Sequence, residues 1–221
     1  VRARGTAVAP APDLEAALGD ELAALDAAGL LRRLHPRARE RDGTLRDADG
    51  RALADFASND YLGLAADPRV AAAAAEQLAR EGLGAGSARL IGGDHALHHA
   101  LEDAVATLKG AESALLFASG WAANAGALPA LAGREDAIYS DALNHASLID
   151  GARLSRATVR VFPHNDLAAL DAMLREDAGR FRRRWLVVEG VYSMDGDLCP
   201  LDALAGLARR HGAFTYVDDA H

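Results

Sequence analysis

The residues best suited to chemistry fall in four short polar segments, each of which follows an apolar stretch. They are Ser119-Gly120-Trp121, Asn144-His145, Glu189 to Ser193, and Asp218 to His221. If the apolar stretches are strands of a parallel sheet, the segments that follow them gather beyond the carboxyl ends of the strands, where α/β proteins bind ligands. Their Ser, His and acidic residues predict a binding or catalytic site at this edge.

Each segment could have a chemical role, and each could also have a purely structural one. At Ser119-Gly120-Trp121 the glycine and the free N–H groups that open a helix suit a phosphate, although the serine could simply cap the helix. His145 could stack on a flat ring or carry a proton, or it could cap a helix. Adjacent carboxylates on a strand face opposite ways, so one of Asp218 and Asp219 can hold a pyridinium proton while His221 reaches a ring substituent. The alternative there is a solvated turn.

Other motifs point away from common enzyme classes. The loop from Gly82 to Arg89 follows a helix and lacks the G-x-G-x-x-G spacing of a dinucleotide loop, which argues against an ordinary nicotinamide-binding domain. His95, His98 and His99 have the spacing of metal ligands, but no matching carboxylate or fourth ligand is evident, so we prefer an ordinary helix face. The sequence contains no G-x-S-x-G or H-E-x-x-H motif, which removes the simplest hydrolase and zinc-protease interpretations.

The pattern of apolar residues predicts the elements that position these segments. Residues 1–50 form an N-terminal helix and a connector or small hairpin, and residues 51–221 alternate between strands and helices. We therefore expect an α/β fold, a mostly parallel sheet flanked by helices. Asp94 is the expected N-cap of the third helix. Helices are expected over 13–34, 68–80, 95–108, 120–131, 146–154, 166–175 and 201–211, and strands over 53–56, 113–117, 137–139, 158–162, 185–189 and 213–218.

The composition and net charge of the chain favour a folded, soluble protein and argue against several other classes. The 221 residues carry a net charge of −8 and are 50% hydrophobic and 25% charged, which suits one folded domain with an appendage. An acidic balance argues against a nucleic-acid binder, and no apolar run reaches the roughly 18–20 residues of a membrane span. No signal sequence is evident at the N-terminus, so we expect a soluble, cytoplasmic protein. Cys199 is the one cysteine, which excludes a disulfide within the chain.

Taken together, these motifs resemble the α-oxoamine synthases, which are pyridoxal-phosphate (PLP) enzymes of the aspartate-aminotransferase fold (fold type I). The resemblance runs from about Leu31 to His221, and the order and spacing of its parts match the family. The segments that carry it are Phe56 to Leu64, Gly82 to Arg89, Ser119 to Asn124, Ser140 to Ser147, Glu189 to Asp197, and Val217 to His221.

The resemblance implies a role for each matching residue. Gly120 and Trp121 would bind the cofactor phosphate through backbone N–H groups. His145 would stack on the pyridine ring, contact substrate and help to move protons, and Asp218 would pair with the pyridinium nitrogen. Two residues would hydrogen-bond the phenolic oxygen, namely Ser193 and His221. Two more would contact substrate or line the mouth of the site, namely Arg32, where a slip to Arg33 is open, and Asn59.

The implied reaction is a decarboxylative condensation of an amino acid with an acyl thioester. Two subfamilies fit. The one we favour makes a biotin precursor from L-alanine and pimeloyl-CoA or a pimeloyl carrier protein, and the other joins glycine to acetyl-CoA. The segment from Ser140 to Gly151 also resembles the second. A rival of another class is a non-catalytic module that keeps the cofactor pocket. The family also implies a homodimer whose glycine-rich loop, from Gly82 to Arg89, approaches the partner's cofactor.

The sequence departs from the family at one decisive point. The lysine that binds the cofactor covalently lies, in the family, roughly thirty residues beyond the Asp-Asp-Ala-His turn, whereas this sequence ends at His221. The single lysine, Lys109, matches no family lysine. We therefore expect the 221-residue chain to be an inactive N-terminal fragment without the small C-terminal domain. Such a fragment would expose a sheet edge and be poorly stable or aggregate.

Overall fold

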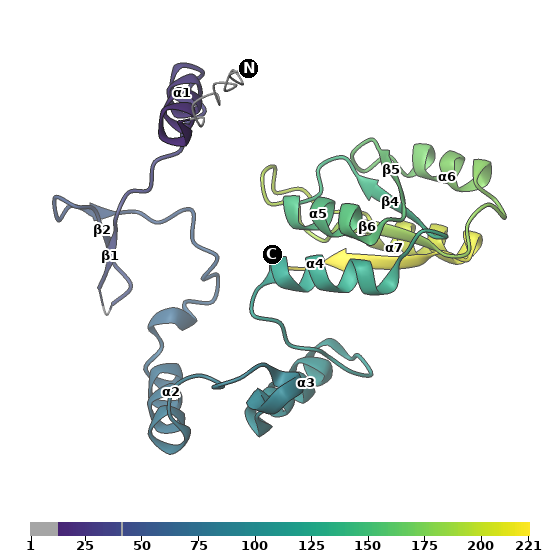
Figure 1. Ribbon diagram of the computed structural model, residues 1–221. Coiled ribbons are helices and arrows are strands. Elements are labelled where there is room, and N and C mark those ends of the chain that lie inside the picture. Colours follow the sequence, from purple (N-terminus) through teal and green to yellow (C-terminus); the bar gives the residue numbers. More distant parts are fainter. Residues whose placement is uncertain (1–12, 41) are drawn as a thin grey trace, which may run out of the picture. The chain divides into compact units, whose positions relative to one another are not determined.

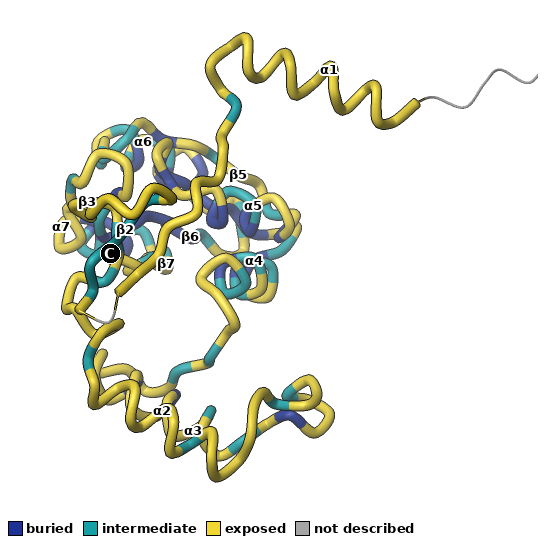
Figure 2. The backbone as a smooth tube through the Cα atoms, turned by 90° about the vertical axis from the view of Figure 1, so that its left-hand side faces the viewer, coloured by how far each residue is buried: buried dark blue, intermediate teal, exposed yellow. Residues whose placement is uncertain are grey.

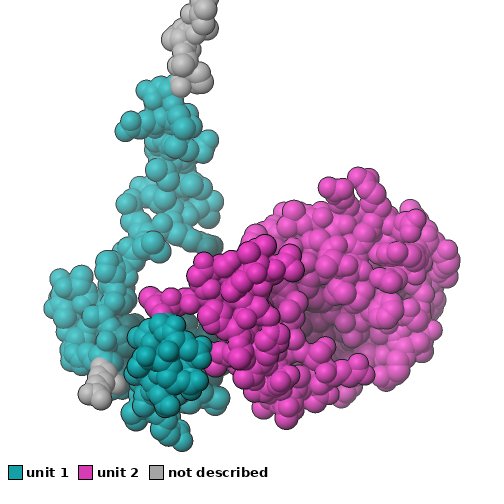
Figure 3. Space-filling view, turned by 60° about the horizontal axis from the view of Figure 1, so that its bottom comes forward, with its two compact units in different colours: residues 1–82 teal, residues 83–221 magenta. Residues whose placement is uncertain are grey.

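The computed structural model describes residues 13–40 and 42–221. The chain divides into two compact units, Val1–Gly82 and Leu83–His221 (Figure 3), each of which is described by itself. Among the described residues, no helix is both long enough and apolar enough to cross a membrane.

The described residues of the first unit form two α-helices, a short 3-10 helix and a small antiparallel sheet. Helix α1 (Leu14–Ala27) begins at Asp13, whose carboxylate accepts the N–H groups of the first turn. Strands β1 (Ala38–Arg39), β2 (Leu45–Arg46) and β3 (Ala52–Leu53) pair in that order. A short 3-10 helix, η1 (Leu64–Ala66), precedes α2 (Pro68–Glu81), which is capped by Asp67. None of the residues in these helices is buried (Figure 2).

The expected helix over 13–34 is wrong at its C-terminal end. Gly29 takes a left-handed conformation with φ 68°, and the N–H groups of Gly29 and Leu30 donate to the carbonyls of Asp26 and Leu25, at 3.0 and 2.9 Å. This pair of hydrogen bonds is a Schellman motif, which ends a helix. The apolar spacing continues past this stop, and the spacing alone therefore overestimated the helix.

The second unit is built on a four-stranded parallel sheet with the order β5-β4-β6-β7 (Figure 1). The strands are β4 (Ala137–Asp141), β5 (Thr158–Phe162), β6 (Arg184–Glu189) and β7 (Phe214–Asp218). The helices are α3 (Ala96–Lys109), α4 (Gly120–Leu131), α5 (Ala146–Ser155), α6 (Leu167–Glu176) and α7 (Leu201–His211), and a π-helical turn, η2 (Arg89–Gly93), precedes α3.

Helices cover both faces of the central strands. Alternate residues of β4 and β6 point to opposite faces, so Tyr139 and Leu186 pack with α6 and α7, while Ile138 and Val187 pack with α4 and α5. The side chains of all four are fully buried. An all-parallel sheet needs this cover on both faces, and the expected α/β fold is confirmed.

The expected strand over 113–117 is wrong. These residues pair with no strand among those described. The N–H of Leu116 instead donates to the Glu102 carboxylate of α3, at 2.7 Å. Leu115 is 67% exposed. The strand expected over 53–56 is also wrong, since β3 ends at Leu53 and pairs with β2 rather than with the large sheet.

His95, and not Asp94, occupies the N-cap of α3. The Asp94 carboxylate is engaged by Arg89 Nε and His99 Nε2, both at 2.7 Å, and this ion-pair cluster draws it away from the helix start. The histidines expected on a helix face serve local structure, because His98 Nδ1 accepts the backbone N–H of His95 at 3.2 Å.

Candidate active site

The four large strands end at one edge of their sheet because they are all parallel. In register, Glu189 at the end of β6 lies opposite Asp218 at the end of β7. The loop after β4 carries Asn144 and His145, and its N–H at His145 donates to Glu189. The polar segments after β4, β6 and β7 that the sequence singled out are thus brought together, as expected.

The imidazole of His145 is fixed at the start of α5. His145 is the N-cap residue, and its Nδ1 accepts the backbone N–H of Ser147 at 3.2 Å. The hydroxyl of Ser147 lies 2.7 Å from the same nitrogen. Ser147 is buried while His145 is exposed, so the structure anchors one ring nitrogen and leaves the rest of the ring accessible. The capping alternative and the chemical role are therefore compatible.

The Asp218 carboxylate is held by one buried side chain and by its own turn. Asn124 Nδ2, from α4, donates to Asp218 Oδ2 at 2.8 Å, and the N–H of Ala220 donates to Oδ1 at 3.1 Å. Both of these donors are uncharged groups. The neighbouring Asp219 accepts instead from the ammonium of Lys109, so the two carboxylates have different partners, as expected if one faces the site and the other supports it.

Glu189 is a buried carboxyl beside Asp218. Its exposure is 4%, and burial, reinforced by the negative charge of Asp218, raises the pKa of Glu189 above its ordinary value. The backbone N–H groups of His145 and Ser193 act in the opposite direction. Glu189 therefore ties the loop of His145 to the loop of Ser193.

The first turn of α4 provides a site for an anion. Ser119 Oγ accepts the N–H of Ala122 at 3.1 Å, and in the described part of the chain the N–H groups of Gly120 and Trp121 have no acceptor. A Cβ built on Gly120 would meet nothing within 4 Å. Four residues of helix rise about 6 Å, so this open turn lies about that far along α4 from Asn124, which touches Asp218.

A second polar cluster holds the loop that carries Ser193. His164 bridges two carboxylates, with Nδ1 at 2.9 Å from Asp141 and Nε2 at 2.7 Å from Asp197. The hydrogen bond to Asp141 raises the pKa of His164 and the one to Asp197 adds to the rise, while burial opposes it. The ring of Tyr192 meets the imidazole edge-on at 4.4 Å. This cluster ties the turn after β6 to the ends of β4 and β5.

The two remaining site residues, Arg32 and Asn59, belong to the first compact unit. Both are exposed, and Asn59 Oδ1 accepts the hydroxyl of Tyr61 at 3.3 Å. Their expected contact with substrate stays a prediction.

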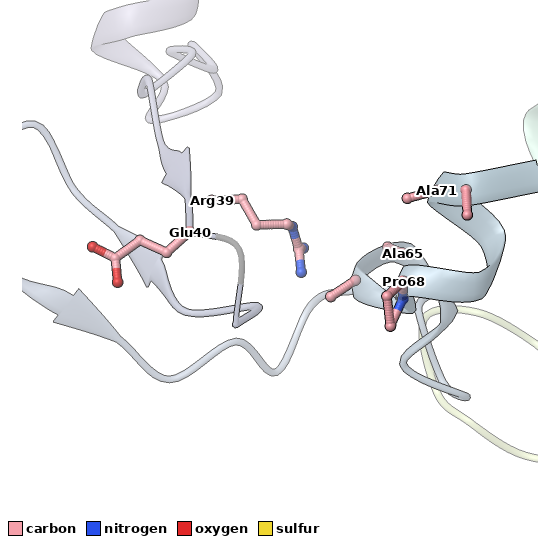
Figure 4. Close-up of a pocket in the computed structure, with 7 residues that line it drawn as sticks. Arg39, Glu40, Ala65, Pro68 and Ala71 are labelled. Carbon is pink, nitrogen blue, oxygen red and sulfur yellow. The ribbon is translucent and has the colours of Figure 1, made fainter. Parts of the chain in front are cut away.

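A pocket of about 520 Å³ also lies in the first unit (Figure 4). Alanine side chains, Pro68, Arg39 and Glu40 line it. It contains none of the residues that the sequence proposed for the site.

The sequence reasoning assigned no role to Asn124, Ser147 or Glu189, although it quoted the segments that contain them. A signal was available for Asn124, which lies four residues before Leu128. Both face the interior from α4, so a polar residue occupies a core position. Such a position requires hydrogen-bond partners, and those partners lie far away in the sequence.

Comparison with known proteins gives the class of protein. The chain belongs to the aminotransferase class I and II family, whose model matches residues 51–221. Among curated relatives, 8-amino-7-oxononanoate synthase of Anaeromyxobacter sp. (strain Fw109-5) is 54% identical over 202 residues, covering 91% of this chain and 50% of the relative. The synthase of Geobacter sulfurreducens is 48% identical over 204 residues, covering 92% and 52%. The chain thus spans about half the length of the curated relatives it matches.

Solved structures agree with this assignment. Serine palmitoyltransferase of Sphingomonas wittichii superposes with a TM-score of 0.81 at 32% identity, over 95% of this chain and 53% of that one. The 8-amino-7-oxononanoate synthase of Francisella tularensis gives 0.63 at 28% identity, over 76% and 45%. Both are α-oxoamine synthases, so the resemblance seen in the sequence is confirmed, as is fold type I.

Proposed function

We propose that the protein containing this chain is a PLP-dependent 8-amino-7-oxononanoate synthase, which condenses L-alanine with pimeloyl-CoA or a pimeloyl carrier protein and releases CO₂. The observation that carries the proposal is the Asp218 carboxylate at the end of β7, which is fixed by uncharged donors and linked through Asn124 and Ser147 to the exposed His145. The 48–54% identity to curated synthases over about nine tenths of the chain supports the choice of subfamily.

The residues present fit the cofactor. The open first turn of α4 presents the N–H groups of Gly120 and Trp121, which suits a phosphate. Asp218 suits a pyridinium N–H, and the accessible imidazole of His145 suits the face of a ring. Ser193 and His221 are the proposed donors to the phenolic oxygen. When bound, the cofactor supplies an electron sink for the carbanion formed at the amino acid.

The residues of this chain have separate tasks in the proposed reaction. Asp218 would pair with the ring nitrogen and keep it protonated, and its donors in the described part of the chain are uncharged. His145 holds the ring in orientation and, through the nitrogen that does not cap α5, can hold or move a proton near the substrate. Arg32 and Asn59 bind or frame the substrate. The glycine-rich loop, Gly82 to Arg89, extends toward the site of a second copy in a cytoplasmic homodimer.

A different α-oxoamine synthase is the second candidate. The chain superposes with a higher TM-score on serine palmitoyltransferase than on the 8-amino-7-oxononanoate synthase of Francisella tularensis, which supports keeping a different acyl donor as an alternative. The segment from Ser140 to Gly151 resembles 2-amino-3-oxobutyrate CoA ligase, which uses glycine and acetyl-CoA. A non-catalytic module with a cofactor pocket is the candidate from another class.

One experiment separates these candidates. The product of the native gene, with its intact mass measured, is assayed with alanine, glycine and serine against pimeloyl-, acetyl- and palmitoyl-CoA. We expect the highest kcat/KM for alanine with pimeloyl-CoA and a mass above 23.1 kDa. A preference for glycine and acetyl-CoA would move the protein to the second subfamily. Binding of PLP without turnover of any pair, at a mass of 23.1 kDa, would favour the non-catalytic module.

A further inference from the structure

Asn124 is the centre of a buried polar network that joins three elements. It is 5% exposed on α4. Its Nδ2 donates to Ser147 Oγ of α5 at 2.9 Å and to Asp218 Oδ2 of β7 at 2.8 Å, and its Oδ1 accepts the hydroxyl of Tyr216 at 2.8 Å. An amide nitrogen carries two hydrogens, so both of its donors and its acceptor are engaged.

The chemistry of the partners determines which way the amide faces. An ionised carboxylate only accepts, so the nitrogen of Asn124 must face Asp218. The oxygen of Asn124 is then left for the hydroxyl of Tyr216. The same nitrogen also donates to Ser147 Oγ, which directs the single hydrogen of that hydroxyl elsewhere.

The hydrogen of Ser147 has one suitable destination among its described contacts, namely His145 Nδ1, at 2.7 Å. The backbone N–H of Ser147 points at the same nitrogen from 3.2 Å, and a backbone N–H can only donate. Nδ1 therefore carries no hydrogen, and the neutral ring of His145 has its proton on Nε2. A chain of hydrogen bonds thus connects the carboxylate of Asp218 to the ring of His145 through the side chains of Asn124 and Ser147.

We propose that Asn124 is a positioning residue that holds the Asp218 carboxylate toward the cofactor ring and, through Ser147, keeps His145 in its Nε2–H tautomer. The inference rests on the proposed function for the roles of Asp218 and His145. Packing alone does not require an amide here, because the face of α4 that contains Asn124 also contains the buried Leu128. A leucine would fill a similar volume without burying polar atoms.

Three variants test the proposal in the native gene product. Asn124→Leu removes the centre of the network. Tyr216→Phe is milder, because it removes the hydroxyl that donates to Asn124 Oδ1 and leaves the amide in place. Tyr139→Phe is the matched control, since it also removes a tyrosine hydroxyl that donates at 2.8 Å, here to Asp177 on the opposite face of the sheet. If Asn124→Leu does not fold, the comparison of Tyr216→Phe with Tyr139→Phe still tests the proposal.

The first readout needs no cofactor. The ¹⁵N shifts of the His145 ring, assigned by loss of its signals in His145→Gln, report the tautomer in the cofactor-free protein. We expect the Nε2–H form in the wild type and in Tyr139→Phe. In Asn124→Leu the Nδ1–H form rises severalfold, because the nearer partner, Ser147 Oγ, is freed to accept from the ring and only the longer contact with the Ser147 backbone N–H still opposes a hydrogen on Nδ1. Tyr216→Phe shows a smaller rise.

The second readout is steady-state kinetics. Loss of a hydrogen bond to a charged group corresponds to about tenfold or more, so kcat in Asn124→Leu falls by about that factor, while KM for the amino acid changes less than about twofold. Unchanged tautomer and kcat in both network variants, or an equal loss in Tyr139→Phe, would overturn the proposal. A wild type without synthase activity whose His145 tautomer still responds to Asn124→Leu would instead overturn the proposed function and leave the network standing.

Discussion

At the scale of single residues, burial is the main cause of the raised pKa of Glu189. The carboxyl accepts backbone N–H groups from two loops, yet burial and the charge of Asp218 raise its pKa. A carboxyl with a raised pKa in the folded state binds its proton more tightly there than in the unfolded chain. Stability is therefore lost as pH rises from the unfolded pKa through the folded one, and the cost remains at neutral pH.

We expect Glu189→Gln to raise the melting temperature at pH 7, because the amide oxygen still accepts the N–H of His145 and no charge is buried. The gain should vanish near pH 4, where the wild-type carboxyl is protonated. Differential scanning calorimetry of both proteins at the two pH values measures this. A melting temperature at pH 7 that falls in the variant would show that the charge of Glu189 stabilises the fold.

His164 has the same pH dependence for a different reason, because the fold favours its charged form rather than its neutral one. Its two carboxylate partners raise its pKa, so its contribution to stability is complete below the unfolded value near 6.5 and is lost as pH rises through the folded value. We expect His164→Asn to lower the free energy of unfolding by about 1–2 kcal/mol near pH 6, and by less at pH 9. Urea unfolding at both pH values measures the difference.

His99→Asn is the matched control for that experiment. His99 also meets a carboxylate, Asp94, at 2.7 Å, but its side chain is 59% exposed. Exposed pairs contribute little, so the control should change stability by less than about 0.5 kcal/mol. Equal losses of stability in the two variants would mean that the hydrogen bonds of His164, which join β4 and β5 to the loop of Ser193, stabilise the protein no more than an exposed pair does.

At the scale of elements, α4 and α5 approach each other closely through Gly151. A Cβ at this position would lie 2.5 Å from the carbonyl oxygen of Asn124 and 3.0 Å from Leu128 Cδ1. Those neighbours are backbone and core, which cannot yield easily. Gly151 thus permits the distance at which Asn124 reaches Ser147.

We expect Gly151→Ala to destabilise the protein by about 1–3 kcal/mol, and to disturb the tautomer of His145 as Asn124→Leu does. Gly206→Ala in α7 is the matched control, because its Cβ would come no nearer than 3.8 Å to a neighbour, the flexible Arg210 side chain. That change should stabilise by up to about 1 kcal/mol through helix propensity. Chemical unfolding of the two variants measures both changes in the free energy of unfolding. If Gly206→Ala is destabilising as well, the loss in Gly151→Ala cannot be attributed to the close approach of α4 and α5.

Local signals predicted some elements to the residue. The helices over 120–131 and 201–211 and the strand over 158–162 have the expected bounds, because caps, glycines and apolar runs mark their ends. The strand expected over 113–117 failed because a strand exists only with a partner, and pairing depends on residues far away in the sequence. The role of Asn124 was hidden for the same reason, since Asp218 lies 94 residues from it.

At the scale of the whole molecule, β7 is an edge of the large sheet, and apolar side chains lie on it. Phe214 is 50% exposed and Val217 38%. An open edge with apolar neighbours is a template for association. We expect the 221-residue chain expressed alone to form oligomers or aggregates and to melt without a sharp transition.

Light scattering after size exclusion, with calorimetry of the same fractions, tests this expectation. The product of the native gene is the reference sample. A well-behaved monomer with a cooperative melt would show that the unpaired edge is protected by the chain itself.

The register of β6 and β7 has a consequence for what the site can hold. It places Glu189 opposite Asp218, so two carboxylates end adjacent strands and one of them is deprived of solvent. Where no positive group lies between or beside these two carboxylates, their negative charges repel each other. A positively charged group of a ligand is therefore favoured at this point of the site, and its charge should add to the stabilisation that ligand binding gives the protein against unfolding.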